Sequence, residues 1–571
     1  MKAGNEMLKG LAVSGGIGIG TVQIIEEKNI EVKKLKTSDP AREIERFDGA
    51  VDRFCENMQK NAVHIKKNAD DSRAKIIEGH ILMIRDPYMQ SETRKKIKKG
   101  CSAEKAISDV CDVFENAFLS SGDERTMERA ADVRDVKNGI LSQLLGNAVS
   151  DFSKFPDGTV LVAEELTPTD ASMIGDNITA VVTAEGGATS HFAILARAMG
   201  LPAVLSVKDI TKKLKNGERV IVDGLDGVVI PSPSAEEEKK YQSKARRVQE
   251  EKKQNELFKN RPTLTADGVK KQVLCNIGSS AEAYLAADSG GEGVGLFRTE
   301  FLFTEAESIP TEEEQFKNYK KAVLAFEDRE VIIRTLDVGG DKKFRCLDDI
   351  VPEENPFLGL RGIRYALKHE EILRSQLRAI LRASAFGKIG IMIPLVTELE
   401  EVRQFKEIYF SEKQRLSEKG ETIGKIKLGV MIETPAAVLI APSLAKEVEF
   451  FSIGTNDLTQ YIMTVDRGNK SVDYLFSCFA PAVVRSLKYV IESAKKAGIP
   501  VGMCGEAAAD PLMIPLLVGL GLEEFSVSPI SVSRTRREIS KRSAKECERI
   551  AEKVFELSTE KEIKDYLKSL Q

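Results

Sequence analysis

The chain has no tryptophan, and only four of its 571 residues are histidine. A sugar-binding barrel usually offers aromatic platforms to its ligand, so the absence of tryptophan disfavours that class of protein. Any chemistry that needs an imidazole has four candidates, which are His64, His80, His191 and His369.

Features typical of several other protein classes are absent as well. The eight cysteines are scattered singly without a C-x-x-C pair, which argues against a disulfide scaffold or a structural zinc site. No apolar run is long enough to cross a bilayer, and the amino terminus lacks a signal-peptide pattern. No Walker A or G-x-G-x-x-G motif supports a nucleotide-binding loop, and a net charge of −4 predicts no nucleic-acid partner. We therefore expect a cytoplasmic protein that does not insert into a membrane.

The patterns that are present predict a multidomain α/β protein. Short buried strands at 160–163, 180–182, 203–205 and 220–222 are punctuated by glycine and proline, and a helix is predicted at 190–199. We interpret residues 10–25 as a Gly-rich loop beside a strand, and we expect that strand to complete the same α/β unit.

The residues between these two parts predict an inserted helical bundle. From Ile44 and Phe47 onward, apolar residues recur at spacings of three and four, and similar stretches cover 73–84, 102–119 and 126–145. The almost purely polar stretch 234–261 predicts a solvated linker helix, with a disordered linker as the alternative. The predicted boundaries are 1–30 and 148–232 for the α/β domain, 31–147 for the insertion, 233–262 for the linker and 263–571 for the last domain.

The last domain predicts a (β/α)8 barrel, because eight apolar runs alternate with amphipathic helices. An open, doubly wound sheet is the alternative architecture. The candidate strands are 273–277, 293–297, 331–336, 390–394, 428–432, 450–454, 500–504 and 524–528.

Charged side chains follow these strands at their carboxyl ends, where a barrel of this kind places its chemistry. Arg298 and Arg334 end two strands, and Arg361, Arg364 and Arg467 lie in the loops that follow. Several guanidiniums predict a small ligand with more than one negative charge, since arginine binds phosphate and carboxylate oxygens with paired hydrogen bonds. Taken singly, each arginine can instead be solvated or salt-bridged.

Two carboxylates at the same strand ends predict a magnesium site. Glu433 and Asp457 are hard oxygen donors, and Mg²⁺ takes one or two carboxylates together with substrate oxygens. Cys504 lies between two glycines and is either a reactive thiol, as nucleophile or proton donor, or a small buried apolar residue.

A second candidate centre lies in the α/β unit. Gly186 and Gly187 turn the chain, Thr189 or Ser190 caps the next helix, and His191 opens it. A helix amino terminus favours an anion, so this imidazole is placed to carry a phosphoryl group, whereas a capping or packing histidine is the alternative.

These motifs resemble the phosphoenolpyruvate-utilising family. The phosphohistidine motif of that family is similar to Gly186-Gly187-Ala188-Thr189-Ser190-His191, and its barrel signatures are similar to Glu433-Thr434-Pro435, Asp457-Leu458-Thr459-Gln460-Tyr461 and Gly502-Met503-Cys504-Gly505-Glu506. The order of domains resembles the enzyme I family of the bacterial sugar phosphotransferase system along essentially the whole chain.

The resemblance implies a role for each candidate residue. His191 would accept the phosphoryl group of phosphoenolpyruvate, and Cys504 would protonate the enolate to give pyruvate. Mg²⁺ would be bound by Glu433 and Asp457. The helical insertion would dock the phosphocarrier protein HPr, the α/β domain would swivel, and the barrel would form a homodimer. Phosphoenolpyruvate would be bound by Arg298, Arg334, Asn456 and Arg467, with Arg361 as a weaker addition.

One position departs from the pattern, and two alternatives stay open. Ala188 stands where many relatives carry a large or basic residue, which puts the rate of transfer or the preferred partner in question. The alternatives are another phosphoenolpyruvate-utilising enzyme of the dikinase or synthase kind and a catalytically silent regulatory relative.

Overall fold

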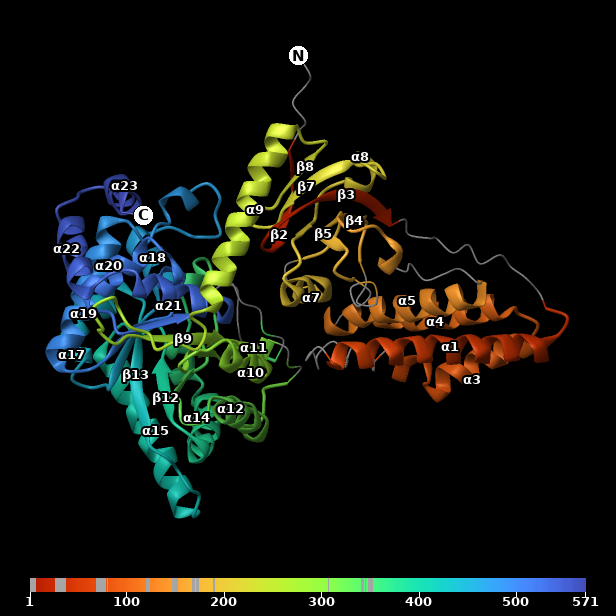
Figure 1. Ribbon diagram of the computed structural model, residues 1–571. Coiled ribbons are helices and arrows are strands. Elements are labelled where there is room, and N and C mark those ends of the chain that lie inside the picture. Colours follow the sequence, from red (N-terminus) through yellow and green to blue (C-terminus); the bar gives the residue numbers. More distant parts are fainter. Residues whose placement is uncertain are drawn as a thin grey trace. The chain divides into compact units, whose positions relative to one another are not determined.

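The structure is a computed structural model that describes residues 7–25, 37–67, 81–119, 124–145, 152–166, 174–187, 190–304, 308–339 and 353–570, with single positions at 79, 170, 306, 344, 346 and 347. The side chain of His191 lies outside this description. The chain divides into two compact units, Met1–Glu251 and Lys252–Gln571 (Figure 1).

The first unit contains a mixed sheet of eight strands in the order β1-β8-β7-β3-β4-β5-β6-β2. The strand predicted to complete this sheet does so, because β3 pairs in parallel with β4 and antiparallel with β7. The short strands β1 and β8 were not predicted. The bounds are β1 (Leu8–Lys9), β2 (Leu11–Ser14), β3 (Ile17–Ile25), β4 (Thr159–Ala163), β5 (Ile178–Thr183), β6 (Ala203–Leu205), β7 (Arg219–Asp223) and β8 (Val228–Pro231).

The Gly-rich run is not a loop beside a strand, and the prediction was wrong on this point. It forms two strands, β2 and β3, that are separated only at Gly15 and Gly16. A Cβ atom at Gly18 would lie 2.4 Å from the Cβ of Ala180, and one at Gly20 would lie 2.1 Å from the carbonyl oxygen of Gly158. These glycines therefore permit close approach of neighbouring chain segments.

The helical stretch of the first unit has its own apolar core. Phe47, Phe54, Ile107 and Ile140 are among its buried members. The helix α3 was not predicted; it begins at Pro87, and the side chain of Asp86 caps its free N–H groups. The residues 73–78 of one predicted stretch lie outside the described residues. The helices of the first unit are α1 (Pro40–Lys67), α3 (Pro87–Lys98), α4 (Ala103–Leu119), α5 (Glu124–Leu145), α7 (His191–Met199), α8 (Ile210–Lys213) and α9 (Ala235–Glu256).

The predicted linker is the helix α9, and none of its residues is buried. Near its middle, Lys244 reaches back to the sheet and pairs with Asp223 and Asp226 at 2.5 and 2.6 Å. Beyond its end, the buried guanidinium of Arg536 donates hydrogen bonds to the carbonyl oxygens of Phe258, at 2.8 Å, and of Lys259. The chain is thus fastened on both sides of the unit boundary.

The second unit is a closed barrel of eight parallel strands in the order β10-β11-β12-β13-β14-β15-β16-β9. The predicted barrel is confirmed, and closure excludes the open sheet. The bounds are β9 (Gln272–Ile277), β10 (Val294–Arg298), β11 (Val331–Arg334), β12 (Ile389–Ile393), β13 (Ile426–Ile432), β14 (Phe450–Ile453), β15 (Val501–Met503) and β16 (Glu524–Val527).

Two apolar layers hold the barrel together. The larger layer lies between the strands and the surrounding helices, whereas a small cluster that includes Leu296, Met431 and Cys504 is formed by side chains of the strands themselves. The helices are α10 (Ser280–Asp288), α11 (Glu300–Thr304), α12 (Glu312–Phe326), α13 (Ile363–Lys368), α14 (Glu370–Ala383), α15 (Leu399–Glu418), α16 (Pro435–Leu439), α17 (Ala441–Leu444), α18 (Thr455–Met463), α19 (Pro481–Ala497), α20 (Met513–Leu520), α21 (Val532–Ser540), α22 (Ala544–Phe555) and α23 (Glu560–Ser569). Among the described residues of the whole chain, no helix combines the length and the apolar character needed to cross a membrane.

A carboxylate at the start of β16 predicts how barrel stability depends on pH. Burial raises the pKa of Glu524 to about 7, and the nearby carboxylate of Glu330 adds to the rise. Because the folded barrel holds this proton more tightly than the unfolded chain, this contribution to stability is fully present below the unfolded pKa of about 4.3 and is lost as the pH rises to about 7.

We expect Glu524→Gln to reduce the loss of barrel stability that occurs as the pH rises. Calorimetric unfolding of the full chain at a series of pH values should show the midpoint of the barrel falling between pH 5 and 7.5 in the wild type. The fall should be smaller in the variant. Parallel curves for the two proteins would contradict this assignment.

Candidate functional site

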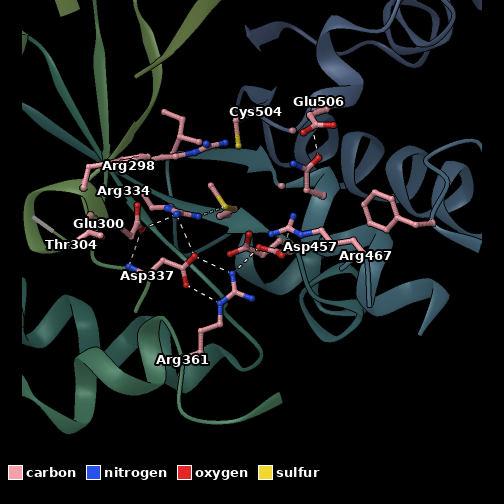
Figure 2. A pocket seen from close by; sticks show the side chains of 18 residues that line it. Arg298, Glu300, Thr304, Arg334, Asp337, Arg361, Asp457, Arg467, Cys504 and Glu506 are labelled. Atoms are coloured by element: carbon pink, nitrogen blue, oxygen red, sulfur yellow. Dashed lines mark hydrogen bonds and ion pairs between the residues drawn. The ribbon is translucent and has the colours of Figure 1, made fainter. Parts of the chain in front are cut away.

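The carboxyl ends of the barrel strands open onto a cavity of about 670 Å³ (Figure 2). Its walls come from the ends of β10, β11, β13, β14 and β15 and from the loops that follow them. The structure brings together eight of the barrel residues that the sequence singled out. These are Arg298, Arg334, Arg361, Glu433, Asn456, Asp457, Arg467 and Cys504.

Arg334 is buried and paired with two carboxylates. Its Nη2 lies 2.7 Å from Oε1 of Glu300 and 3.2 Å from Oδ2 of Asp337. The Nε–H has no hydrogen-bond partner within the described part of the chain. A buried N–H that lacks a partner is costly, so this group is available to an oxygen atom of a ligand.

Arg361 joins two acidic residues that come from different strand ends. It donates to both carboxylate oxygens of Asp337 at 3.1 Å and to Oδ2 of Asp457 at 2.8 Å. Its Nη1 donates to the hydroxyl of Tyr461 at 3.2 Å. Four of the five N–H groups of the guanidinium therefore have an acceptor among the described residues, and the fifth is left for a ligand. Figure 2 shows this chain of contacts running from Arg334 through Asp337 and Arg361 to Asp457.

Two further arginines line the cavity with fewer constraints. Arg298 ends β10 and is exposed. The side chain of Arg467 is 37% exposed, and its Nη1 lies 3.8 Å from Oδ1 of Asp457. Beside them, the amide oxygen of Asn456 accepts a hydrogen bond from the backbone N–H of Glu506 at 3.2 Å. This fixes Asn456 across the ends of β14 and β15.

Glu433 is held in place by the backbone N–H of Leu395, a residue that has an unfavourable backbone conformation. Its Oε1 accepts a hydrogen bond from Leu395 at 2.7 Å, and Leu395 has φ +53°, which a branched residue rarely adopts. Burial raises the pKa of Glu433 well above its usual range, and the negative charges of Asp457 and Asp337 add to this. Oδ1 of Asp457 is buried and accepts no hydrogen bond from the described residues.

These two side chains are suited to a divalent cation. Glu433 and Asp457 offer hard oxygen atoms, and Oδ1 of Asp457 accepts no hydrogen bond from the described residues. The described residues contain no cluster of three or more histidine, cysteine, aspartate or glutamate side chains arranged for a metal ion. The remaining ligands would then be substrate oxygens or water.

Cys504 combines both of the interpretations that the sequence left open. Its side chain is only 3% exposed and belongs to the apolar cluster formed by the barrel strands, yet it also lines the cavity. Burial raises the pKa of the thiol. The sulfur atom therefore keeps its proton near neutral pH, which suits a proton donor better than a thiolate nucleophile.

The second candidate centre is described only in part. The predicted helix is α7, which begins at His191, and its first turn is capped by Ser190, whose hydroxyl oxygen accepts a hydrogen bond from Ala193 at 3.3 Å. Ala188 and Thr189 lie outside the described residues, as does the His191 side chain.

Three residues of the site had no role predicted from the sequence, and one arginine predicted at the mouth of the barrel lies elsewhere. Glu300, Asp337 and Tyr461 were not assigned a role, although Glu300 and Asp337 follow strand ends in the same way as the predicted residues. Arg364 does not line the cavity. Instead it donates to the carbonyl oxygens of Leu358 and Gly359 and so supports a loop.

Three family matches cover the two units. The family described as "PEP-utilising enzyme, PEP-binding domain" matches residues 252–544, the "mobile domain" matches 155–227 and the "N-terminal" family matches 9–129. Enzymes of this family use a divalent metal.

Curated relatives match along nearly the full length. A phosphoenolpyruvate-protein phosphotransferase of Bacillus subtilis (strain 168) is 41% identical over 564 residues, which cover 98% of this chain and 99% of the relative. Proteins of the same name from Priestia megaterium and Staphylococcus aureus (strain MSSA476) are 40% and 39% identical, with 98% of both chains covered in each case. The chain therefore belongs to the phosphoenolpyruvate-utilising enzymes and, within them, to the phosphoenolpyruvate-protein phosphotransferases.

Proposed function

We propose that this enzyme transfers the phosphoryl group of phosphoenolpyruvate to a ring nitrogen of His191, releases pyruvate, and then passes the phosphoryl group to a histidine of HPr. The single observation that carries the proposal is the convergence of four arginines, four buried carboxylates and a protonated thiol on one barrel-end cavity. That combination suits a small substrate with both a phosphate and a carboxylate group.

The arginines that would bind the substrate differ in how many of their N–H groups are already paired within the protein. Arg298 and Arg467 have guanidiniums that are least engaged, and Arg334 offers its unpartnered Nε–H. Phosphoryl transfer depends mainly on charge neutralisation and alignment, which such fixed donors provide. Asn456 would add an amide N–H, while Arg361 would chiefly hold Asp337 and Asp457 in position.

The finer assignment of the metal is Mg²⁺, held by Glu433 and Asp457. When bound, the ion would supply positive charge that stabilises the developing negative charge on the substrate oxygens. Arg361 now occupies Oδ2 of Asp457, so Oδ1 is the oxygen that is open to another partner.

Cys504 would complete the conversion to pyruvate. The bond between phosphorus and the enol oxygen breaks as a bond between phosphorus and the His191 nitrogen forms, which leaves an enolate. The methylene carbon of the enolate then takes the proton of the Cys504 thiol, and solvent restores that proton. The buried, protonated state of the thiol supports this role.

The domain boundaries expected from the sequence give each part a function. Residues 1–30 and 148–232 would form a mobile phosphohistidine domain, and residues 31–147 would dock HPr. The linker 233–262 would join these parts to the barrel, 263–571, which would also form the homodimer. His191 and the barrel cavity must meet during transfer, so the mobile part would swivel between the cavity and HPr.

The test uses the full chain with phosphoenolpyruvate labelled with ³²P in the phosphoryl group. With Mg²⁺ present, we expect pyruvate release together with a protein label that is acid-labile and alkali-stable, as a phosphohistidine is. Adding HPr should move the label to HPr. Label on the protein that HPr cannot remove would overturn the relay, and a folded protein that takes up no label would support the silent regulatory alternative.

A further inference from the structure

A second cavity of about 440 Å³ lies at the opposite end of the barrel from the candidate site. Its lining includes the first residues of β9 and β15, Gln272 and Val501, and Glu523, which precedes β16. Because all strands of the barrel run in parallel, these residues mark its amino-terminal end. We call this cavity the base pocket; it is lined by Val269, Lys270, Lys271, Gln272, Ile491, Lys495, Val501, Gly521 and Glu523.

The base pocket contains a buried ammonium group that forms no direct ion pair with a described carboxylate. Lys271 is only 6% exposed, and its Nζ donates one hydrogen bond, at 2.7 Å, to the carbonyl oxygen of Leu522. Within the described part of the chain no carboxylate forms an ion pair with it. An ammonium has three N–H donors, so two of them have no acceptor among the residues that the structure describes. Burying a cation in this way is unfavourable unless an anion offsets the cost.

The remaining lining residues define what such an anion would look like. Lys270 and Lys495 bring two more positive charges, and Glu523 brings one negative charge. Burial lowers the pKa of Lys271, because desolvation disfavours its charged form, while the charge of Glu523 acts in the opposite direction. Ile491 and Val501 add apolar surface, and the volume exceeds that of a simple inorganic anion.

We propose that the base pocket binds a small anion with one phosphate or carboxylate group and a short apolar body, and that Lys271 is its principal contact. The proposal does not rest on the function proposed for the opposite end of the barrel. It predicts a binding site that is separate from the phosphoenolpyruvate cavity, since no residue lines both.

The test measures the binding of ³²P-labelled inorganic phosphate to the full chain by equilibrium dialysis at constant ionic strength. All proteins carry Arg467→Met, so that binding at the opposite cavity is weakened. Adding Lys271→Met should lower the affinity at least tenfold. Glu523→Gln removes a negative charge from the lining and should raise it several-fold.

Lys496→Met is the matched control, because Lys496 is a neighbouring exposed lysine that does not line the pocket. It should leave binding unchanged; an equal loss in this control would indicate general attraction to surface lysines and overturn the proposal. Unchanged affinity in the Glu523→Gln protein would overturn it even if Lys271→Met failed to fold. Displacement of the label by propionate identifies a carboxylate ligand, whereas retention identifies a phosphate ligand.

Discussion

Replacing His191 with alanine should abolish the labelling of this protein by phosphoenolpyruvate that carries a radioactive phosphoryl group. Alanine offers no nitrogen, and the neighbouring Ser190 hydroxyl could form only an acid-stable ester. The label that is lost in mild acid and kept in alkali should therefore be stoichiometric in the wild type and undetectable in the variant. Release of pyruvate should fall with it, because the phosphoryl group has no acceptor.

The substitution should leave the fold intact. Alanine is the best helix-forming residue, and the cap of α7 is made by the side chain of Ser190 with Ala193 rather than by His191. Thermal unfolding of the variant should match that of the wild type.

The matched control is His369→Gln on the barrel, where His369 stacks on Tyr365 with ring centroids 4.2 Å apart. This variant should still take up label. If the His191→Ala protein kept an acid-labile label, or if the His369→Gln protein lost it, the acceptor would be misassigned.

Arg334→Met should damage both catalysis and stability. The guanidinium is a buried partner of Glu300 and Asp337. Asp337 keeps Arg361 as a partner, but removal of Arg334 leaves the buried Glu300 without a charged partner among the described residues. Breaking a buried pair in this way typically costs about 3–5 kcal/mol. In the proposed reaction Arg334 also supplies a fixed positive charge beside the phosphoryl group, so its loss should lower the rate of pyruvate formation about a hundredfold.

Arg467→Met separates these two effects. Arg467 is partly exposed and lies 3.8 Å from Asp457, so its ion pair contributes about 1 kcal/mol or less to stability. We expect a comparable loss of rate with an almost unchanged unfolding midpoint. Calorimetry on both variants would measure the loss of stability, and single-turnover release of pyruvate would measure the loss of rate. Equal midpoints for the two variants would mean that the buried network around Arg334 does not stabilise the barrel.

The barrel could be predicted because of how its strands are buried. A parallel strand covered on both faces is a short continuous apolar run, and all eight such runs became strands. The position of a side chain just after such a run then places it at one end of the barrel. This is why Arg298, Glu433 and Cys504 could be assigned to one cavity.

The pairing inside that cavity could not be predicted. Arg334 and Glu300 are 34 positions apart, and Arg361 and Asp457 are 96 positions apart, so only the closed barrel brings each pair into contact. The structure of the Gly-rich run was predicted wrongly for a related reason. Gly18 and Gly20 are required by chain segments that are remote in sequence, whereas local patterns associate glycine with loops.

The two anchors of α9 bear on how the sequence can change over generations. Lys244 ties the middle of this helix to Asp223 and Asp226, and Arg536 ties the chain beyond its end to the barrel. Each half of the protein thus closes its own network of interactions before the chain passes to the other half. A heritable substitution at Asp223 or Lys244 therefore acts first on the stability of the first unit, and one at Arg536 acts first on the stability of the barrel.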